Sequence, residues 1–321
     1  MKFKPIIIVA GEPNSIFSEI FLKAVKNNKF KSPIIIICSK TILIQQINFL
    51  KSNLKFSTLE QKDLLNKKIK LDKINLINVD FTQSKPFEKI SSKSNNYINE
   101  SFKVAIKLIK NKISKKLING PISKKYFLKK RFHGVTEYLA HHTFTKKFVM
   151  IIYNKSLSVC PITTHVPIKY VNRFIKKSEI INKVIIISDF WEKKFKFKPN
   201  IAITGLNPHC ESIDNYNEDT NVIKPAIKKL KKLKYKVSGP FSADTIFLKN
   251  NRNKFDVIVG MYHDQVLTPM KTLYEYDAIN ITAGLPFLRI SPDHGPNENM
   301  IGKNTSNPLS LVKAIKFLDK N

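Results

Sequence analysis

Three histidines stand at the ends of apolar, β-branched runs, and their shared placement could create a metal site. His165 closes one run, whereas His209 and His263 follow the runs at 201–204 and 257–260 within a few residues. Where such runs form parallel strands, their carboxyl ends meet at one edge of the sheet, and ligands bind there in open α/β sheets. Three neutral imidazoles at that edge suit a divalent metal and leave coordination positions open for a substrate.

Two interpretations of these histidines stay open from their placement alone. A single histidine after a strand is more often a hydrogen-bonding loop residue than a metal ligand. Because three histidines occupy the same topological position, the metal-ligand interpretation and the loop-residue interpretation are about equally supported. His133, His141 and His142 lack this placement, and the adjacent pair 141–142 is expected on a helix face.

Two carboxylates accompany the histidines. Asp264 directly follows His263, and Asp244 lies in the polar segment that follows Gly239-Pro240. Either carboxylate could orient a metal-binding imidazole by accepting a hydrogen bond from its second ring nitrogen. Either could equally cap the N-terminus of a helix.

Apolar runs rich in β-branched residues alternate with amphipathic stretches along most of the chain. This alternation predicts parallel strands joined by crossover helices, and therefore an α/β sandwich. The expected strands are Ile6–Val9, Pro33–Cys38, Ile74–Val79, Phe148–Tyr153, Ser158–Thr163, Ile201–Thr204, Val257–Gly260 and Ile279–Thr282. The expected helices are Ile16–Val25, Ile42–Leu50, Tyr97–Ile109, Ser178–Lys194, Ile223–Leu233 and Leu309–Leu318.

The length of 321 residues allows two domains or one large α/β unit. No internal repeat and no Pro- or Ser-rich linker divides the chain, so two domains would share strands or be discontinuous. No apolar run reaches the roughly 18 residues of a transmembrane helix. The short run Ile6–Ala10 leads into Gly11-Glu12-Pro13, which is typical of a turn and not of a signal-peptide cleavage site. We expect a cytoplasmic protein with no membrane partner.

Cysteine usage fits a reducing compartment. Cys38, Cys160 and Cys210 are an odd set without paired spacing, so a disulfide framework is not expected.

The formal net charge of +32 raises the alternative of a nucleic-acid-binding protein. The lysines are spread over all the expected surface segments, however, and arginine is rare beside lysine. Such a distribution is typical of a lysine-enriched composition and not of a nucleic-acid-binding stripe, so a nucleic-acid partner is the less favoured interpretation. The same charge would attract an anionic, phosphorylated metabolite.

Six segments carry recognisable motifs in a fixed order, and Arg289 and Asp293-His294-Gly295 follow them. The segments are Asn119–Lys124 (NGPISK), Gly134–Ala140 (GVTEYLA), Thr163–Pro167 (TTHVP), Gly205–His209 (GLNPH), Met261–Gln265 (MYHDQ) and Asn280–Phe287 (NITAGLPF). In these motifs the chain resembles the 4-hydroxythreonine-4-phosphate dehydrogenase (PdxA) family, and the resemblance covers almost its whole length.

For the fold, the resemblance implies an α/β/α sandwich similar to the isocitrate and isopropylmalate dehydrogenases, with an active site in the cleft between two domains. The first domain would comprise residues 1–126 and 270–321 on the nucleotide side. The second, residues 127–269, would carry the metal ligands and the dimer contacts. The absence of a GxGxxG segment after the first expected strand agrees with a fold other than the Rossmann fold.

For the activity, the resemblance implies oxidation of 4-phosphooxy-L-threonine at its 3-hydroxyl, followed by decarboxylation to 3-amino-2-oxopropyl phosphate in vitamin B6 synthesis. NAD would be the cofactor, with NADP also possible. One divalent metal per site (Zn, Mg or Co) would lower the pKa of the substrate hydroxyl and stabilise the enolate. The resemblance also implies a homodimer whose active sites are shared between subunits.

The resemblance assigns a role to individual residues of this chain. The metal ligands would be His165, His209 and His263, and the catalytic residues Lys271, Asp244 and Asp264. Substrate contacts would come from Val135, Thr136, Lys271, Asn280 and Arg289, and cofactor contacts from His294, Gly295, Asn299 and Gly302.

The chain departs from the family pattern at several positions. Val135 stands where the family has a histidine that is expected to touch the substrate phosphate. This difference leaves open a related dehydrogenase that acts on 4-phospho-threonate or 4-phospho-erythronate. A relative without catalysis is a further alternative, against which the three retained histidines argue. Glycines or small residues of the family are also replaced in three loops, at Ser15 and Phe17, at Glu211–Asn215, and at Pro296, Asn297 and Asn299.

Overall fold

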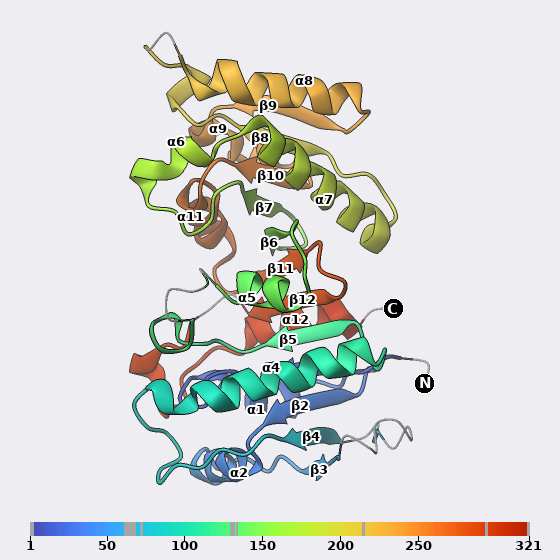
Figure 1. The fold of residues 1–321 in the computed structure, drawn as a ribbon, viewed down its shortest axis with the longest axis vertical. Coiled ribbons are helices and arrows are strands. Elements are labelled where there is room, and N and C mark those ends of the chain that lie inside the picture. Colours follow the sequence, from blue (N-terminus) through green and yellow to red (C-terminus); the bar gives the residue numbers. More distant parts are fainter. Residues whose placement is uncertain are drawn as a thin grey trace. The chain divides into compact units, whose positions relative to one another are not determined.

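The computed structural model describes residues 3–60, 69–70, 73–128, 132, 134–213, 216–292 and 295–319. The chain forms two compact units (Figure 1). Unit 1 comprises Met1–Thr143 and Pro286–Asn321, and unit 2 comprises Phe144–Leu285. The domain boundaries expected from the sequence, at 126/127 and 269/270, stay a prediction.

The sheet of unit 1 is parallel throughout its described strands. Their order is β3–β4–β2–β1–β5–β12. The central strands are uninterrupted runs of Ile and Val, as expected where helices cover both faces of a parallel sheet. The bounds are β1 Ile6–Val9, β2 Ile34–Cys38, β3 Phe56–Thr58, β4 Ile74–Asn78, β5 Lys116–Asn119 and β12 Leu288–Pro292.

Helices cover the sheet of unit 1 on two sides. Helix α4 packs against β1 and β2 and lies in front of these strands in Figure 1, whereas α12 packs against β1, β5 and β12 from behind. Helix α1 packs on α12 and α2. The expectation of a helix–sheet–helix sandwich is confirmed for this unit. The bounds are α1 Phe17–Lys26, α2 Lys40–Phe49, α4 Asn95–Lys110, α5 Val135–His142 and α12 Leu309–Asp319.

The sheet of unit 2 is mixed, in the order β11–β6–β7–β10–β8–β9. Strands β7, β10, β8 and β9 are parallel, but β6 is antiparallel to both β7 and β11. The expectation of parallel strands is wrong for β6, because only residues 154–157 connect it to β7. Such a connection is too short for a crossover helix. The bounds are β6 Val149–Tyr153, β7 Ser158–Pro161, β8 Ile201–Thr204, β9 Val237–Phe241, β10 Val257–Gly260 and β11 Ile279–Ala283.

The helices of unit 2 follow the parallel strands. Helix α7 packs against β6 and β11, and α11 packs against β7 and β10. The bounds are α6 Val171–Phe174, α7 Lys177–Phe195, α8 Lys224–Lys232, α9 Ala243–Ile246, α10 Lys249–Arg252 and α11 His263–Tyr274.

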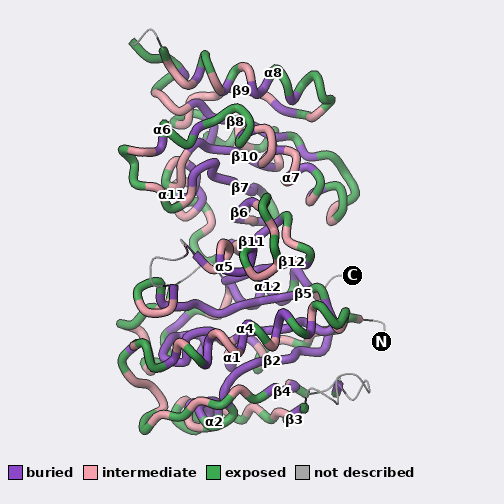
Figure 2. Tube along the Cα trace, in the orientation of Figure 1, coloured by how far each residue is buried: buried purple, intermediate pink, exposed green. Residues whose placement is uncertain are grey.

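The strands form the buried interior of each unit (Figure 2). All eight expected strands are present, with ends that differ by two residues or fewer. The sequence interpretation missed β3, β5, β9 and β12, which are short or contain Lys, Arg, Gly or Pro. In the described part of the chain, no helix combines the length and apolar character that crossing a bilayer requires.

Candidate active site

His165 and His263 lie side by side beyond the ends of two paired strands. Strands β7 and β10 run in parallel register, and the pairing continues past them through a 3.1 Å hydrogen bond from Thr163 N to Met261 O. The Thr163 hydroxyl donates to the same carbonyl at 2.9 Å. The two imidazole rings are consequently 6.0 Å apart between centroids, with an angle of 37° between their planes.

A carboxylate orients the second of these rings. His263 is the first residue of α11, not a loop residue as expected, and its Nδ1 lies 2.6 Å from Asp264 Oδ1. A carboxylate on Nδ1 favours the tautomer whose Nε2 lone pair is free to bind a metal. Asp264 is therefore placed to orient an imidazole and is not the N-cap of α11, which is Tyr262.

His209 lies in a loop at the same carboxyl edge, after β8. Its backbone is left-handed (φ 55°), and its side chain is exposed. The fully buried Asp219 holds the loop, because its carboxylate accepts hydrogen bonds from Leu206 N at 2.8 Å and from Asn207 N at 3.2 Å. Asn207 Nδ2 donates a further bond to Asp219 at 2.9 Å. A buried carboxylate thus fixes the backbone from which His209 projects.

Gln265 joins the ends of β8 and β10. Its Oε1 accepts hydrogen bonds from Thr204 Oγ1 at 2.8 Å and Met261 N at 2.7 Å, and its Nε2 donates to Gly205 O at 2.8 Å. The sequence interpretation assigned no role to Gln265 or Asp219. The place of Gln265 in the motif Met261–Gln265 was a signal for its role, whereas nothing in the sequence pointed to Asp219.

Among the described residues, no group of three or more His, Cys, Asp or Glu side chains lies close enough together to hold a metal ion. The structure thus pairs His165 with His263 and places His209 after the neighbouring strand. Asp244 is exposed in the first turn of α9, two residues after the N-cap Ser242, so it is not a cap either.

Thr136 and Arg289 meet in unit 1. Arg289 on β12 is 3% exposed, and its Nη1 donates to Thr136 Oγ1 at 3.3 Å. Its Nε donates to Asn119 Oδ1 at 2.7 Å. Asn119, at the end of β5, was not among the expected site residues, although it begins one of the motifs. These contacts place a guanidinium at the N-terminus of α5, where backbone N–H groups add to the positive potential, and this arrangement would suit an anion.

Burial lowers the pKa of Arg289 to about 10, and the charge of Glu137 opposes this effect. The guanidinium therefore stays protonated at neutral pH. Val135, the first residue of α5, precedes Thr136 and supplies no polar atom from its side chain. The pair 141–142 does lie on this helix, as expected.

Lys271 and Asn280 belong to unit 2. Lys271 lies on α11, half-buried and seven residues after Asp264, so the two share a face of the helix. Asn280 is on β11, and its Oδ1 is buried with no hydrogen-bond partner among the described residues. A buried acceptor of this kind is costly unless a ligand or water donates to it.

The expected cofactor residues lie in the loop between β12 and α12. Gly295 and Asn299 are exposed, and a Cβ added to Gly295 would meet no atom within 4 Å. Gly302 needs its glycine conformation, with φ at +74°. His294 lies outside the described residues, as does His133.

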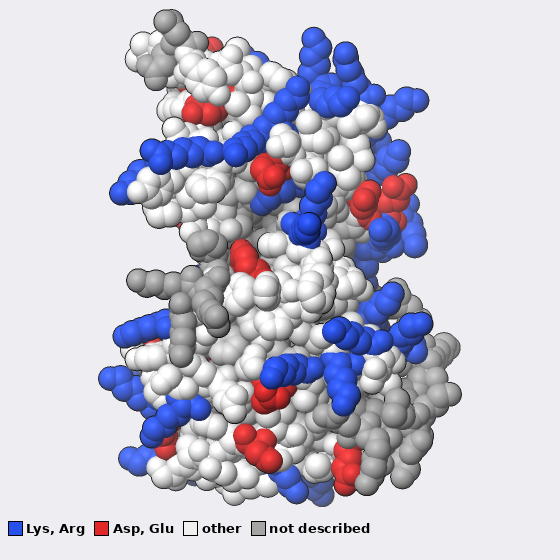
Figure 3. All heavy atoms as spheres, in the orientation of Figure 1, with Lys and Arg blue, Asp and Glu red and all other residues white. Residues whose placement is uncertain are grey.

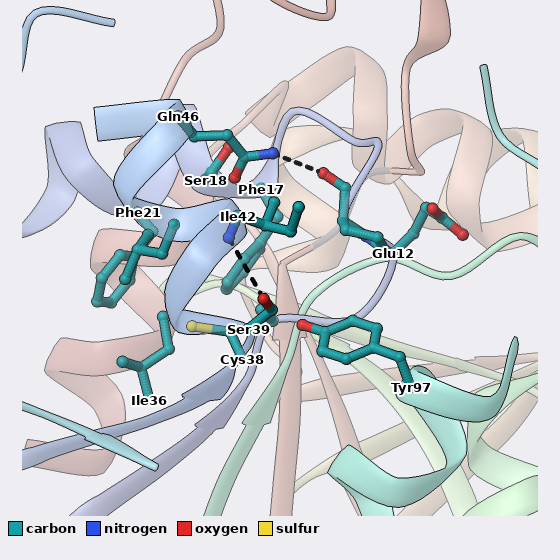
Figure 4. Close-up of a pocket in the computed structure, with 13 residues that line it drawn as sticks. Glu12, Phe17, Ser18, Phe21, Ile36, Cys38, Ser39, Ile42, Gln46 and Tyr97 are labelled. Carbon is teal, nitrogen blue, oxygen red and sulfur yellow. Dashed lines mark hydrogen bonds between the residues drawn. The ribbon is translucent and has the colours of Figure 1, made fainter. Parts of the chain in front are cut away.

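A small cavity lies at the carboxyl ends of β1 and β2 in unit 1 (Figure 4). Its volume of about 20 Å³ has room for roughly one water molecule. Burial raises the pKa of the Cys38 thiol on its wall to about 12 and raises that of Tyr97 as well. The cavity is too small for a cofactor or a phosphorylated substrate.

Lysine and arginine are spread over the visible surface (Figure 3). One local group lines a surface groove between α8 and β9. It consists of Lys224, Lys228, Lys231 and Lys232. Lysines beside a strand at the end of a sheet also protect that edge from pairing with another chain, so this group alone does not indicate a nucleic-acid site.

Comparison with known proteins identifies the relatives of this chain. The family described as pyridoxal phosphate biosynthetic protein PdxA matches residues 29–318. A 4-hydroxythreonine-4-phosphate dehydrogenase from Sulfurihydrogenibium sp. (strain YO3AOP1) is 38% identical over 97% of this chain and 96% of its own length. One from Aquifex aeolicus is 32% identical over 98% of both chains. The crystal structure of a 4-hydroxythreonine-4-phosphate dehydrogenase from Klebsiella pneumoniae has a TM-score of 0.85 over 98% of both chains. Its 24% identity makes this a likeness of fold.

Proposed function

This chain belongs to the PdxA family of pyridoxal phosphate biosynthetic proteins, and we propose that it oxidises 4-phosphooxy-L-threonine at the 3-hydroxyl and decarboxylates the product. The observation that carries the proposal is the pairing of His165 and His263 beyond β7 and β10, with Asp264 on the second ring. An imidazole held in one tautomer by a carboxylate is a common form of metal ligand.

The residues fit a divalent metal by their donor chemistry. His165, His209 and His263 would hold it through neutral imidazole nitrogens, which suit Zn or Co better than Mg. When bound, the metal would lower the pKa of the substrate hydroxyl and stabilise negative charge on that oxygen. Asp264 would keep Nε2 of His263 free, and Asp219 would hold the loop of His209 in place.

We assign substrate binding to the anion-binding residues. Thr136 and Arg289 would bind the phosphate, because a buried guanidinium and a helix N-terminus both favour a dianion. Lys271 and Asn280 would hold the carboxylate end. The unpartnered Oδ1 of Asn280 is an acceptor, which suits an ammonium or hydroxyl donor of the substrate.

The reaction balances with NAD as the hydride acceptor. With NAD bound as hydride acceptor, the substrate would give up a hydride and the proton of its hydroxyl, and the β-keto acid would then lose CO2 and take up one proton at carbon. The net products are 3-amino-2-oxopropyl phosphate, CO2 and NADH. Lys271 would donate the proton at carbon, and Asp244 is kept as a proposed catalytic residue. Gly295, Asn299 and Gly302, together with His294, are the proposed cofactor residues; NADP stays possible.

We also propose that the protein acts as a homodimer in the cytoplasm. Large apolar side chains are exposed close to the histidine loops, with Ile168 and Phe174 after His165 and Ile213 and Tyr216 after His209. A second copy of the chain would bury them. If two copies of the chain share the metal site, a single chain would not bring all of its histidine ligands together.

The test is NADH formation from 4-phosphooxy-L-threonine by the purified protein, before and after chelation and with added Zn²⁺, Co²⁺ or Mg²⁺. Metal-dependent NADH that is lost in His209→Ala supports the reaction and the ligand assignment together. No NADH under any metal condition would overturn the proposed activity.

Val135 favours a second candidate function, in which the same oxidation acts on a different phosphorylated substrate. Without the polar contact that a histidine would give, the site would bind the substrate phosphate less tightly, by roughly 1.5–3 kcal/mol for a bond to a charged group. A phosphorylated threonate or erythronate is the alternative substrate. Comparing kcat/KM for the two substrates on one preparation decides between them.

A further inference from the structure

Two charged residues of α1 fasten the loop 295–306, which carries the proposed cofactor residues. Lys23 Nζ donates hydrogen bonds to Asn304 O at 2.8 Å and Ser306 O at 3.0 Å. Its third bond goes to Glu19 Oε1 at 2.9 Å, so all three N–H groups of the ammonium are used. Glu19 Oε1 also accepts the backbone N–H of Ser306 at 2.5 Å.

The other end of the loop is attached to the same helix. Ile16 N, just before α1, donates to Pro296 O at 3.2 Å. The segment between the two attachments contains one turn of 3₁₀ helix, Glu298–Met300, and left-handed residues at Asn297 and Gly302. Most of its side chains are exposed. Gly302 lies against the rings of Phe49 and Phe87, and the two attachments to α1 hold the ends of the loop.

The attachment of the loop to α1 depends on a buried carboxylate. Glu19 is 1% exposed, and its Oε2 has no hydrogen-bond partner among the described residues. Lys23 is partly exposed, so the ion pair is only partly buried; such a pair adds little net stability, but it does fix one arrangement of the groups bound to it. A loop ordered before its ligand arrives binds that ligand more tightly, because less freedom is lost on binding.

We propose that Glu19 and Lys23 are positioning residues for the cofactor: they hold loop 295–306 in the arrangement that binds the nucleotide. The identity of the ligand rests on the proposed function, whereas the fastening itself rests on the contacts above. The pair acts through the loop backbone and does not touch the reacting atoms.

The experiment compares Lys23→Met and Glu19→Gln with the matched control Lys26→Met. Lys26 is exposed on the last turn of the same helix, and its side chain makes no hydrogen bond within the described residues. Two properties are measured: amide hydrogen exchange of the loop in the protein without cofactor, and NADH affinity by fluorescence titration. We expect faster exchange in the loop for both variants. We also expect NADH dissociation constants to rise roughly tenfold, the equivalent of about 1.4 kcal/mol, with kcat at saturating NAD little changed.

Lys23→Arg, which keeps the charge and several donors, should restore part of the affinity. Glu19→Gln keeps the shape of the side chain and an acceptor for Ser306 N, so it remains informative if Lys23→Met folds poorly. Unchanged loop exchange and unchanged NADH affinity in both variants would overturn the inference. If the wild-type protein does not bind NADH, the proposed function and the cofactor part of this inference both fail, and the exchange comparison still decides whether the pair orders the loop.

Discussion

His165 and His263 have ring centroids 6.0 Å apart, although 98 residues separate them in the sequence. The reason is strand register. Pro161 pairs with Gly260 in β7 and β10, and the bond from Thr163 N to Met261 O continues the pairing beyond the strands. His165 follows Thr163 by two residues, and His263 follows Met261 by two residues. The parallel pairing of the strands therefore brings the two rings together.

Asp264→Asn should weaken metal binding without unfolding the protein. The Asp264 side chain is 80% exposed, so its contribution to stability is small, but it orients His263 through Nδ1. Loss of such a partner typically lowers metal affinity roughly 10- to 100-fold. The measurement is competition with a chelator for Zn²⁺ or Co²⁺, with Asp189→Asn on α7 as the control. Equal affinities in variant and wild type would show that Asp264 does not orient a ligand.

Asp219→Asn should destabilise the loop of His209. The buried carboxylate accepts hydrogen bonds from two backbone N–H groups and one side-chain amide. In an asparagine, one of the two oxygens becomes an NH2 group, which would face one of these donors and cannot accept its bond. We expect a loss of about 1–3 kcal/mol in the free energy of unfolding, measured with urea. Glu218→Gln, which alters a longer contact to the same asparagine at 3.3 Å, is the control and should cost less. Equal losses would contradict the special role of Asp219.

Arg289→Lys and Thr136→Val should raise KM for the phosphorylated substrate. Lysine keeps the charge but cannot contact Asn119 and Thr136 with a planar fork, and valine removes the hydroxyl. Each lost charge-assisted bond should weaken binding by roughly 1.5–3 kcal/mol, about 10- to 150-fold. Steady-state kinetics with NAD at saturation gives the values. A KM equal to that of the wild type in both variants would show that the phosphate binds at other residues.

Glu12 should make stability depend on pH in a defined direction. Burial raises the pKa of this carboxyl above its usual 4.5, against the lowering effects of bonds from Asn14 and Ser94. The stability from this group is full below the unfolded pKa and is lost as pH rises through the folded pKa, because the unfolded state releases its proton first. Glu12→Gln cannot ionise. Its unfolding free energy relative to the wild type should therefore rise as the pH increases above about 4.5 in urea titrations. A pH-independent difference would refute the assignment.

Ile168→Glu combined with Phe174→Glu should give a monomer. Both side chains are large, apolar and exposed, at 71% and 52%. Burying a carboxylate in an interface without a partner is strongly unfavourable. Light scattering after gel filtration measures the mass of the variant and of the wild type, with Leu233→Glu on another exposed apolar residue as the control. A dimeric double variant would exclude this face as the interface.

The sequence by itself determined the α/β class and the eight strands that are apolar, β-branched runs. Runs such as Ile34–Cys38 are buried on both faces, and their shortness and β-branched residues favour a strand over a buried helix. It also placed the three histidines after strands, and the motifs indicated the family. Antiparallel β6 and polar strands such as β12 were not predictable in this way, because their assignment depends on connection length and on neighbours far away in the sequence.

Only the tertiary structure decided which polar groups meet. The contact of Arg289 with Asn119 spans 170 residues, and the support of His209 by Asp219 depends on a loop whose backbone is left-handed. Sequence patterns report the face on which a side chain lies, because periodicity is a local property. Hydrogen bonds between distant loops depend on strand order and register, which are fixed only when the whole sheet is assembled.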